Sequence, residues 1–145
     1  MPRRVHAVLR WVLTVVMVAA GANHFVNPPP YLGMMPAELP ESSHLALVYL
    51  SGVFEILGGL GLILPATRRL AAWGLIALFI AVFPANLNMA LNQLPLGDDP
   101  VPTWALWARL PLQLGLIAWA YAIARYTGAS TSVATATRPA TSRPR

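Results

Sequence analysis

Four long apolar segments constrain this chain more than any other feature of its sequence. They cover residues of about 6–26, 44–64, 70–94 and 103–126, and each has about the ~20 residues that a helix needs to cross a bilayer. Lipid offers no hydrogen bonds to the backbone, so a spanning segment must satisfy its own N–H and C=O groups as a helix. The sequence therefore predicts an all-α integral membrane four-helix bundle, with one domain over residues 1–127.

The charged residues predict an orientation for this bundle. Arginines flank the first span, fill the turn between the second and third spans and end the fourth, whereas the other two loops carry only acidic charges. Because positive residues stay on the cytoplasmic side, we expect both termini in the cytoplasm and the 27–43 and 95–102 loops outside the inner membrane. The same distribution argues against a nucleic-acid partner, despite the net charge of +5. The residues concerned are Arg3, Arg4, Arg10, Arg68, Arg69 and Arg125, with Glu38, Glu41, Asp98 and Asp99.

The two ends of the chain need separate interpretation. The start "MPRR", an apolar stretch and "AGA" resemble a signal peptide, but the stretch is long enough to span and its cleavage would leave only three spans. We therefore keep it as the first span. Residues 128–145 consist of Gly, Ala, Ser, Thr, Val, Pro and Arg and show no periodicity. This composition predicts a disordered, basic cytoplasmic tail.

The loop after the first span is unusually apolar for a connection. Its sequence, "NPPPYLGMMPAELPESS", either folds over the mouth of the bundle as a lid or serves as a proline-stiffened connector with interfacial anchors. The chain contains no cysteine, which excludes a disulfide relay, a thiolate nucleophile or a Cys-held metal within it.

Polar residues inside the spans form the candidate site. An Arg or Asp at the centre of a spanning helix costs about 2.5–3.5 kcal/mol, so such residues face the bundle interior or water, usually in pairs. At ~1.5 Å of rise per residue, all of them lie in the outer half of the membrane. The candidate ligand-binding residues are His24, Glu55, Asn86, Arg109 and Gln113.

Helical spacing tests whether these residues can meet. On three of the spans, the polar candidates share one helix face with small or apolar residues. The face of the first span carries Thr14, Met17, Gly21 and His24. The face of the second carries Val48, Gly52, Glu55, Ile56 and Gly59, and that of the fourth carries Ala105, Arg109, Gln113, Leu116 and Ala120. Depth and facing predict an ion pair between Arg109 and Glu55, which either serves a ligand site or only fixes helix register. One His and one Glu make a poor metal-ligand set, so we expect no metal site.

The third span is less regular. Asn86 and Asn88 lie about 200° apart on an ideal helix and cannot both face inward without distortion. Pro84 and Pro111 each remove a backbone donor and leave a carbonyl for a polar side chain to bond. Asn88 shares a face with the small residues Gly74, Ala77 and Ala81, which predicts a helix-packing seam.

Four stretches in chain order carry a family resemblance: "GANHFVNPPPYLGMMPAELP", "SGVFEILGGLGLILPATRRLAAWGLI", "VFPANLNMAL" and "LWARLPLQ". Together they resemble the DoxX-like family of small four-helix membrane proteins, over residues of about 7–125. The family's polar elements match His24, Glu55 and Asn86, together with Arg109 and Gln113 in "RLPLQ". The resemblance implies a subunit associated with a membrane redox complex, and a distant branch of the family contains receptor-assembly chaperones.

Two functions follow as expectations. In the first, a redox-associated subunit binds a quinone-like or other small amphipathic molecule, with Arg109 and Gln113 bonding its oxygens, Glu55 orienting Arg109 and His24 passing a proton. In the second, a non-catalytic assembly protein packs against another membrane protein through its small-residue seams. We expect an accessory subunit more than a self-sufficient enzyme, and we assign no catalytic residue. Transport is disfavoured because no polar series continues to the cytoplasmic side.

Overall fold

The computed structural model describes the backbone of residues 3–96 and 100–136, and the side chains of 4–96 and 100–126. The elements are α1 (Arg3–Val26), the short α2 (Pro29–Leu32), α3 (Glu41–Ile63), α4 (Arg68–Leu91) and α5 (Thr103–Ala136). The four long helices are long and apolar enough to cross a membrane. The predicted all-helical bundle is thus confirmed, and its four apolar helices indicate a multi-pass membrane protein.

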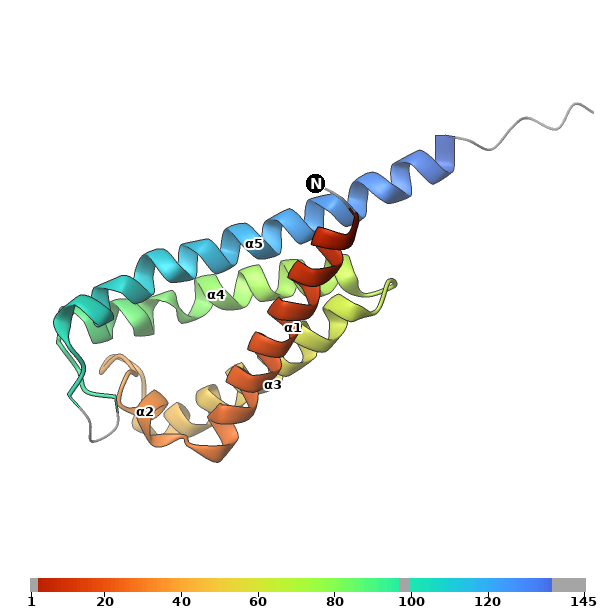
Figure 1. The fold of residues 1–145 in the computed structure, drawn as a ribbon. Coiled ribbons are helices and arrows are strands. Elements are labelled where there is room, and N and C mark those ends of the chain that lie inside the picture. The colour runs from red at the N-terminus through yellow and green to blue at the C-terminus, as the bar shows by residue number, and fades with distance from the viewer. Residues whose placement is uncertain (1–2, 97–99, 137–145) are drawn as a thin grey trace, which may run out of the picture.

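The long helices form two pairs that meet at one end of the molecule. Helix α1 packs along α3, α3 along α4, and α4 along α5. Figure 1 shows the α1–α3 pair and the α4–α5 pair converging near the α3–α4 turn and diverging towards α2. At the converging end His6 of α1 stacks on Tyr126 of α5, with ring centroids 3.8 Å apart. The fold is therefore a wedge that opens towards α2.

Two apolar clusters hold the wedge in shape. The larger lies towards the converging end and takes buried side chains from all four long helices, including Leu13, Leu62, Leu75 and Ile123. The smaller lies at the open end, where Met34 packs with Met89, Ala90 and Leu106. Large apolar side chains elsewhere face outward, as a lipid environment requires; Val15, Leu57, Leu70 and Leu112 are examples.

Helices α1 and α3 approach each other more closely than side chains would permit. A Cβ atom placed on Gly21 would lie 2.6 Å from the Gly52 carbonyl oxygen, and one on Gly52 would lie 2.8 Å from the Gly21 carbonyl oxygen. Both contacts are with backbone, which cannot rotate away. Only glycine at these two positions lets the helices pack at this distance.

The α3–α4 turn is closed by side chains that bond the last carbonyls of α3. Thr67 donates its hydroxyl to the Gly61 carbonyl at 3.0 Å, and Arg68 donates to the Leu62 and Ile63 carbonyls at 2.9 and 3.0 Å. These groups have no partner within the helix itself. Arg68 therefore has a structural role at the converging end.

Two details go beyond the sequence prediction. The fourth apolar span has its predicted bounds, Thr103–Tyr126, but helix α5 continues to Ala136, because this alanine-containing stretch has no proline before Pro139 to stop it. The small residues Gly74, Ala77 and Ala81 on α4 are exposed, and a Cβ on Gly74 would meet nothing within 4 Å, so no other described helix of this chain packs on the predicted seam. The acidic pair Asp98 and Asp99 and the predicted tail from residue 137 onwards lie outside the described residues.

The glycine contact predicts a stability difference between two identical substitutions. We expect Gly21→Ala to lower the free energy of unfolding by about 1–3 kcal/mol, because its methyl group must push α1 away from α3. Gly74→Ala should leave stability unchanged or raise it by up to about 1 kcal/mol, since alanine favours the helix and the space is open. Unfolding of both variants in mixed detergent micelles measures the difference; equal stabilities would contradict the close contact.

A candidate ligand cavity between α3 and α4

A cavity of about 590 Å³ lies between α3 and α4 at the open end of the wedge. Its walls are mainly apolar: Leu47, Leu50 and Phe54 come from α3, and Leu78, Val82 and Ala85 from α4. Towards the converging end, the side chains of the larger apolar cluster fill the space between the helices. At the open end α3 and α4 diverge, and their side chains leave this space unfilled. The cavity is thus a consequence of the wedge shape.

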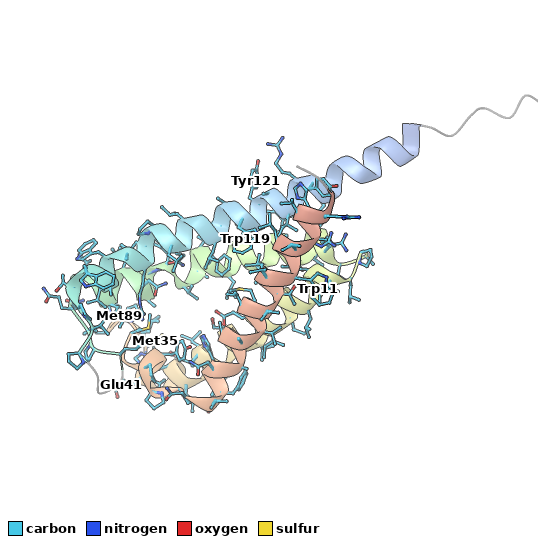
Figure 2. The ribbon with its side chains drawn as sticks, in the orientation of Figure 1. Trp11, Met35, Glu41, Met89, Trp119 and Tyr121 are labelled. Atoms are coloured by element: carbon cyan, nitrogen blue, oxygen red, sulfur yellow. The ribbon has the colours of Figure 1, made fainter. Side chains whose placement is uncertain are left out.

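The segment that follows α1 closes one side of this cavity. Tyr31, Met34 and Met35 line it, and Met34 is buried against the smaller apolar cluster. Asn88 of α4 donates from Nδ2 to the Met34 and Met35 carbonyls, at 3.2 and 3.4 Å. Figure 2 shows Met35 and Met89 at the end where the helix pairs diverge. We call residues 28–40 the covering segment.

His24 and Glu55 form a buried ion pair on the cavity wall. His24 Nε2 lies 3.4 Å from Glu55 Oε2, and both residues line the cavity. The other ring nitrogen, Nδ1, lies 2.9 Å from the Val48 carbonyl oxygen. The imidazole also stacks on the Tyr31 ring at 3.8 Å, and Tyr31 accepts a hydrogen bond from Asn23 at 2.8 Å. His24 is therefore held from three sides, by α3 and by the covering segment.

This geometry fixes where the protons of the pair lie. A carbonyl oxygen only accepts hydrogen bonds, so His24 Nδ1 carries the hydrogen that it donates to Val48. With Nδ1 protonated, a favourable contact between Nε2 and the Glu55 carboxylate needs one further proton between them. The pair is then neutral overall, whether that proton stays on the imidazole or on the carboxyl group.

The predicted ion pair between Arg109 and Glu55 is wrong. Among the described residues the ionic partner of Glu55 is His24, while Arg109 Nη1 contacts Met89 Sδ at 3.2 Å and Met34 Sδ at 4.0 Å. The reason is the order of the helices, because α5 packs along α4 and not along α3. The two residues share a depth and face inward, but they belong to different pairs of the wedge.

Gln113 and Asn86 form a second polar group, on the α4 side. Gln113 is buried, and its Oε1 accepts a hydrogen bond from Asn86 Nδ2 at 2.9 Å. Its Nε2 donates to the Phe79 carbonyl, one residue before the Ile80 carbonyl that Pro84 leaves without its helical donor. Asn86 lines the cavity and Gln113 does not, so Gln113 positions the Asn86 amide.

Three of the five predicted site residues thus line the cavity: His24, Glu55 and Asn86. Gln113 lies behind Asn86, and Arg109 lies beside the covering segment. Within the described ranges, no group of three or more His, Cys, Asp or Glu side chains could hold a metal ion.

Sequence reasoning missed Ser51. Its hydroxyl is buried, lines the cavity and has no hydrogen-bond partner in the described structure. Ser51 precedes Glu55 by four residues and so lies one turn away on the same face of α3. That spacing is a signal for Ser51, but a weak one, because a single serine in an apolar helix is common and does not by itself indicate a site.

Double-mutant cycles test which partner Glu55 has. We expect His24→Ala and Glu55→Ala to be coupled by about 1–3 kcal/mol in the free energy of unfolding, because each removes the same buried pair. Arg109→Ala and Glu55→Ala should add within about 0.5 kcal/mol. Detergent unfolding of the single and double variants gives both values. Strong coupling of Arg109 to Glu55 would reverse the assignment.

No curated protein and no solved structure matches this chain. Residues 13–124, which include the whole of α3 and α4 and every residue of the cavity wall, match the model of one family. The chain belongs to the family described as Domain of unknown function (DUF8561).

Proposed function

We propose that this protein is a redox-associated membrane subunit that binds a quinone-like or other small amphipathic molecule in the cavity between α3 and α4. The observation that carries the proposal is the cavity itself, whose volume of about 590 Å³ falls within the range of small-molecule sites. Apolar walls with a few polar groups are the usual composition of such sites.

The polar groups divide between two walls. His24, Ser51 and Glu55 stand on the α1–α3 side, and Asn86 stands on the α4 side, held by Gln113. In this proposal they bond the polar head of the ligand. Arg109 takes a different place from the one expected from sequence: its Nη1 lies 4.0 Å from Met34 Sδ, beside the covering segment.

The ligand reaches the cavity from the lipid phase. Leu50 and Phe54 line the cavity and are also 50% and 51% exposed, and Pro84 in the facing wall is exposed as well, so the cavity opens on the outer surface of the bundle. An amphipathic molecule dissolved in the bilayer would meet this opening directly. The distribution of arginines supports a bundle with both termini in the cytoplasm and the cavity in the outer half of the inner membrane.

The redox association rests on the DoxX-like resemblance. The chain has no cysteine, so any thiol chemistry in such a complex would belong to a partner protein. A subunit of this kind would hold the amphipathic molecule, and the partner would supply the electron transfer. That division of roles is why we propose an accessory subunit.

A second candidate is an assembly protein that packs against another membrane protein. The glycines of α3 that suggested this are covered by α1, as Gly52 meets Gly21. On α4, however, Gly74 and Ala77 are exposed and would let a partner helix approach closely. Crosslinking from position 77 in native membranes tests the second candidate, because only this candidate requires a stable partner at this face of α4.

Filling the cavity should abolish binding. We expect Ala81→Trp to remove saturable binding of a quinone analogue, because Ala81 lines the cavity and an indole would occupy it. Ala77→Trp is the matched control: it lies one turn away on α4, is exposed and does not line the cavity. Equilibrium binding to purified protein in nanodiscs measures both. Equal binding by the two variants would contradict a site in this cavity.

A further inference from the structure

We propose that the cavity selects neutral amphipathic molecules whose head group donates a hydrogen bond, such as phenols and quinols, and rejects anionic amphipaths. This inference rests on the proposed binding function and adds the chemical class of the ligand. It follows from which polar groups of the wall are already bonded and which are not.

The Glu55 carboxylate presents more acceptor capacity than the protein satisfies. Its Oε2 is buried, and its contact in the described structure is His24 Nε2 at 3.4 Å, which leaves further lone pairs without a donor. Asn86 donates from Nδ2 to Gln113, so its Oδ1 is the atom left to accept a hydrogen bond. Buried acceptors without donors are costly, so a ligand that brings a donor gains more than one that brings only an acceptor.

The wall presents no free positive charge. No arginine is among the residues that line the cavity, and Arg109 contacts the sulfur atoms of Met34 and Met89 instead. The imidazole of His24 has both ring nitrogens engaged, with Val48 and with Glu55. The other ionisable groups on the wall are Tyr31 and the acidic Glu38. A carboxylate or phosphate head would therefore lose its hydration without meeting a counter-charge.

Ser51 completes the match to a hydroxyl head group. Its hydroxyl is unbonded and can both donate and accept, and it lies one helical turn from Glu55 on the same wall. A phenol can donate to the Glu55 carboxylate while accepting from Ser51. A quinone carbonyl or an ether accepts only, and leaves the carboxylate oxygen without a donor.

Three probes with the same alkyl chain test this selection: a para-alkylphenol, its methyl ether and the para-alkylbenzoate. Each is titrated against the full-length protein in nanodiscs, with affinity corrected for partitioning into empty nanodiscs. We expect the phenol to bind about tenfold or more tightly than either of the other two, the difference that one hydrogen bond to a charged or buried acceptor makes. The tight site should be lost in Ala81→Trp.

The outcomes separate this inference from the proposed function. If the ether or the benzoate binds in the cavity as tightly as the phenol, the selection for a neutral donor is wrong while ligand binding stands. If none of the three saturates a site that Ala81→Trp removes, both the selection and the proposed function are wrong.

Two variants assign the selection to its residues. Glu55→Gln should reduce the preference for phenol over ether towards unity, whereas Glu41→Gln, the same change at an exposed residue of α3 outside the cavity, should leave it unchanged. Ser51→Ala removes an oxygen that bonds to no protein group, so the fold should be retained and the phenol should bind several-fold more weakly. An unchanged preference in Glu55→Gln together with unchanged phenol affinity in Ser51→Ala would overturn the assignment.

Discussion

At Gly21 and Gly52 the backbones of α1 and α3 come so close that neither position has room for a Cβ atom. The two helices run antiparallel, so His24 lies over Gly52 and Glu55 lies over Gly21: a Cβ on Gly52 would lie 2.9 Å from His24 Cβ, and one on Gly21 would lie 3.0 Å from Glu55 Cβ. Because the two helices run past each other at this short distance, the imidazole reaches the carboxylate directly. The ion pair of the candidate site therefore depends on two glycines that contribute no side chain to it.

The same contact explains why the molecule is a wedge and not a uniform bundle. Helix α1 is fixed to α3, and α5 packs along α4, while α3 and α4 are joined by a short turn whose carbonyls Thr67 and Arg68 bond. Each pair therefore behaves as a unit that is anchored to the other at the turn. Away from the turn the pairs diverge (Figure 1), and the covering segment, held by Asn88, spans the open end. His24, Glu55 and Asn86 lie at that end, where the diverging pairs leave the cavity that these residues line.

Much of this arrangement could be predicted from helical spacing. The stripe of Thr14, Met17, Gly21 and His24 is buried throughout, and on α3 Val48, Gly52, Glu55 and Gly59 are buried likewise. Spacing could not predict which stripes face each other, since Arg109 and His24 both lie on stripes that can face Glu55, and the depth counted along the helices favoured Arg109. The choice depends on helix order and on the approach distance at the glycines, which are tertiary properties. Asn86 and Asn88 show the same limit: they bond different partners, Gln113 and the covering segment, whereas spacing placed Asn88 only on a seam with small residues.

The neutrality of the His24–Glu55 pair explains how a carboxylate can line a cavity between apolar helices. An isolated carboxylate in a spanning helix costs several kcal/mol, which would favour its protonation or its replacement. Val48 keeps a hydrogen on Nδ1, and one further proton shared between Nε2 and the carboxyl group leaves the pair without net charge. Moving that proton between the two partners changes the acceptor strength of Glu55 but not the charge of the site. The wall can therefore offer a strong acceptor to a ligand hydroxyl, and adapt to it, while the membrane surrounds no net charge.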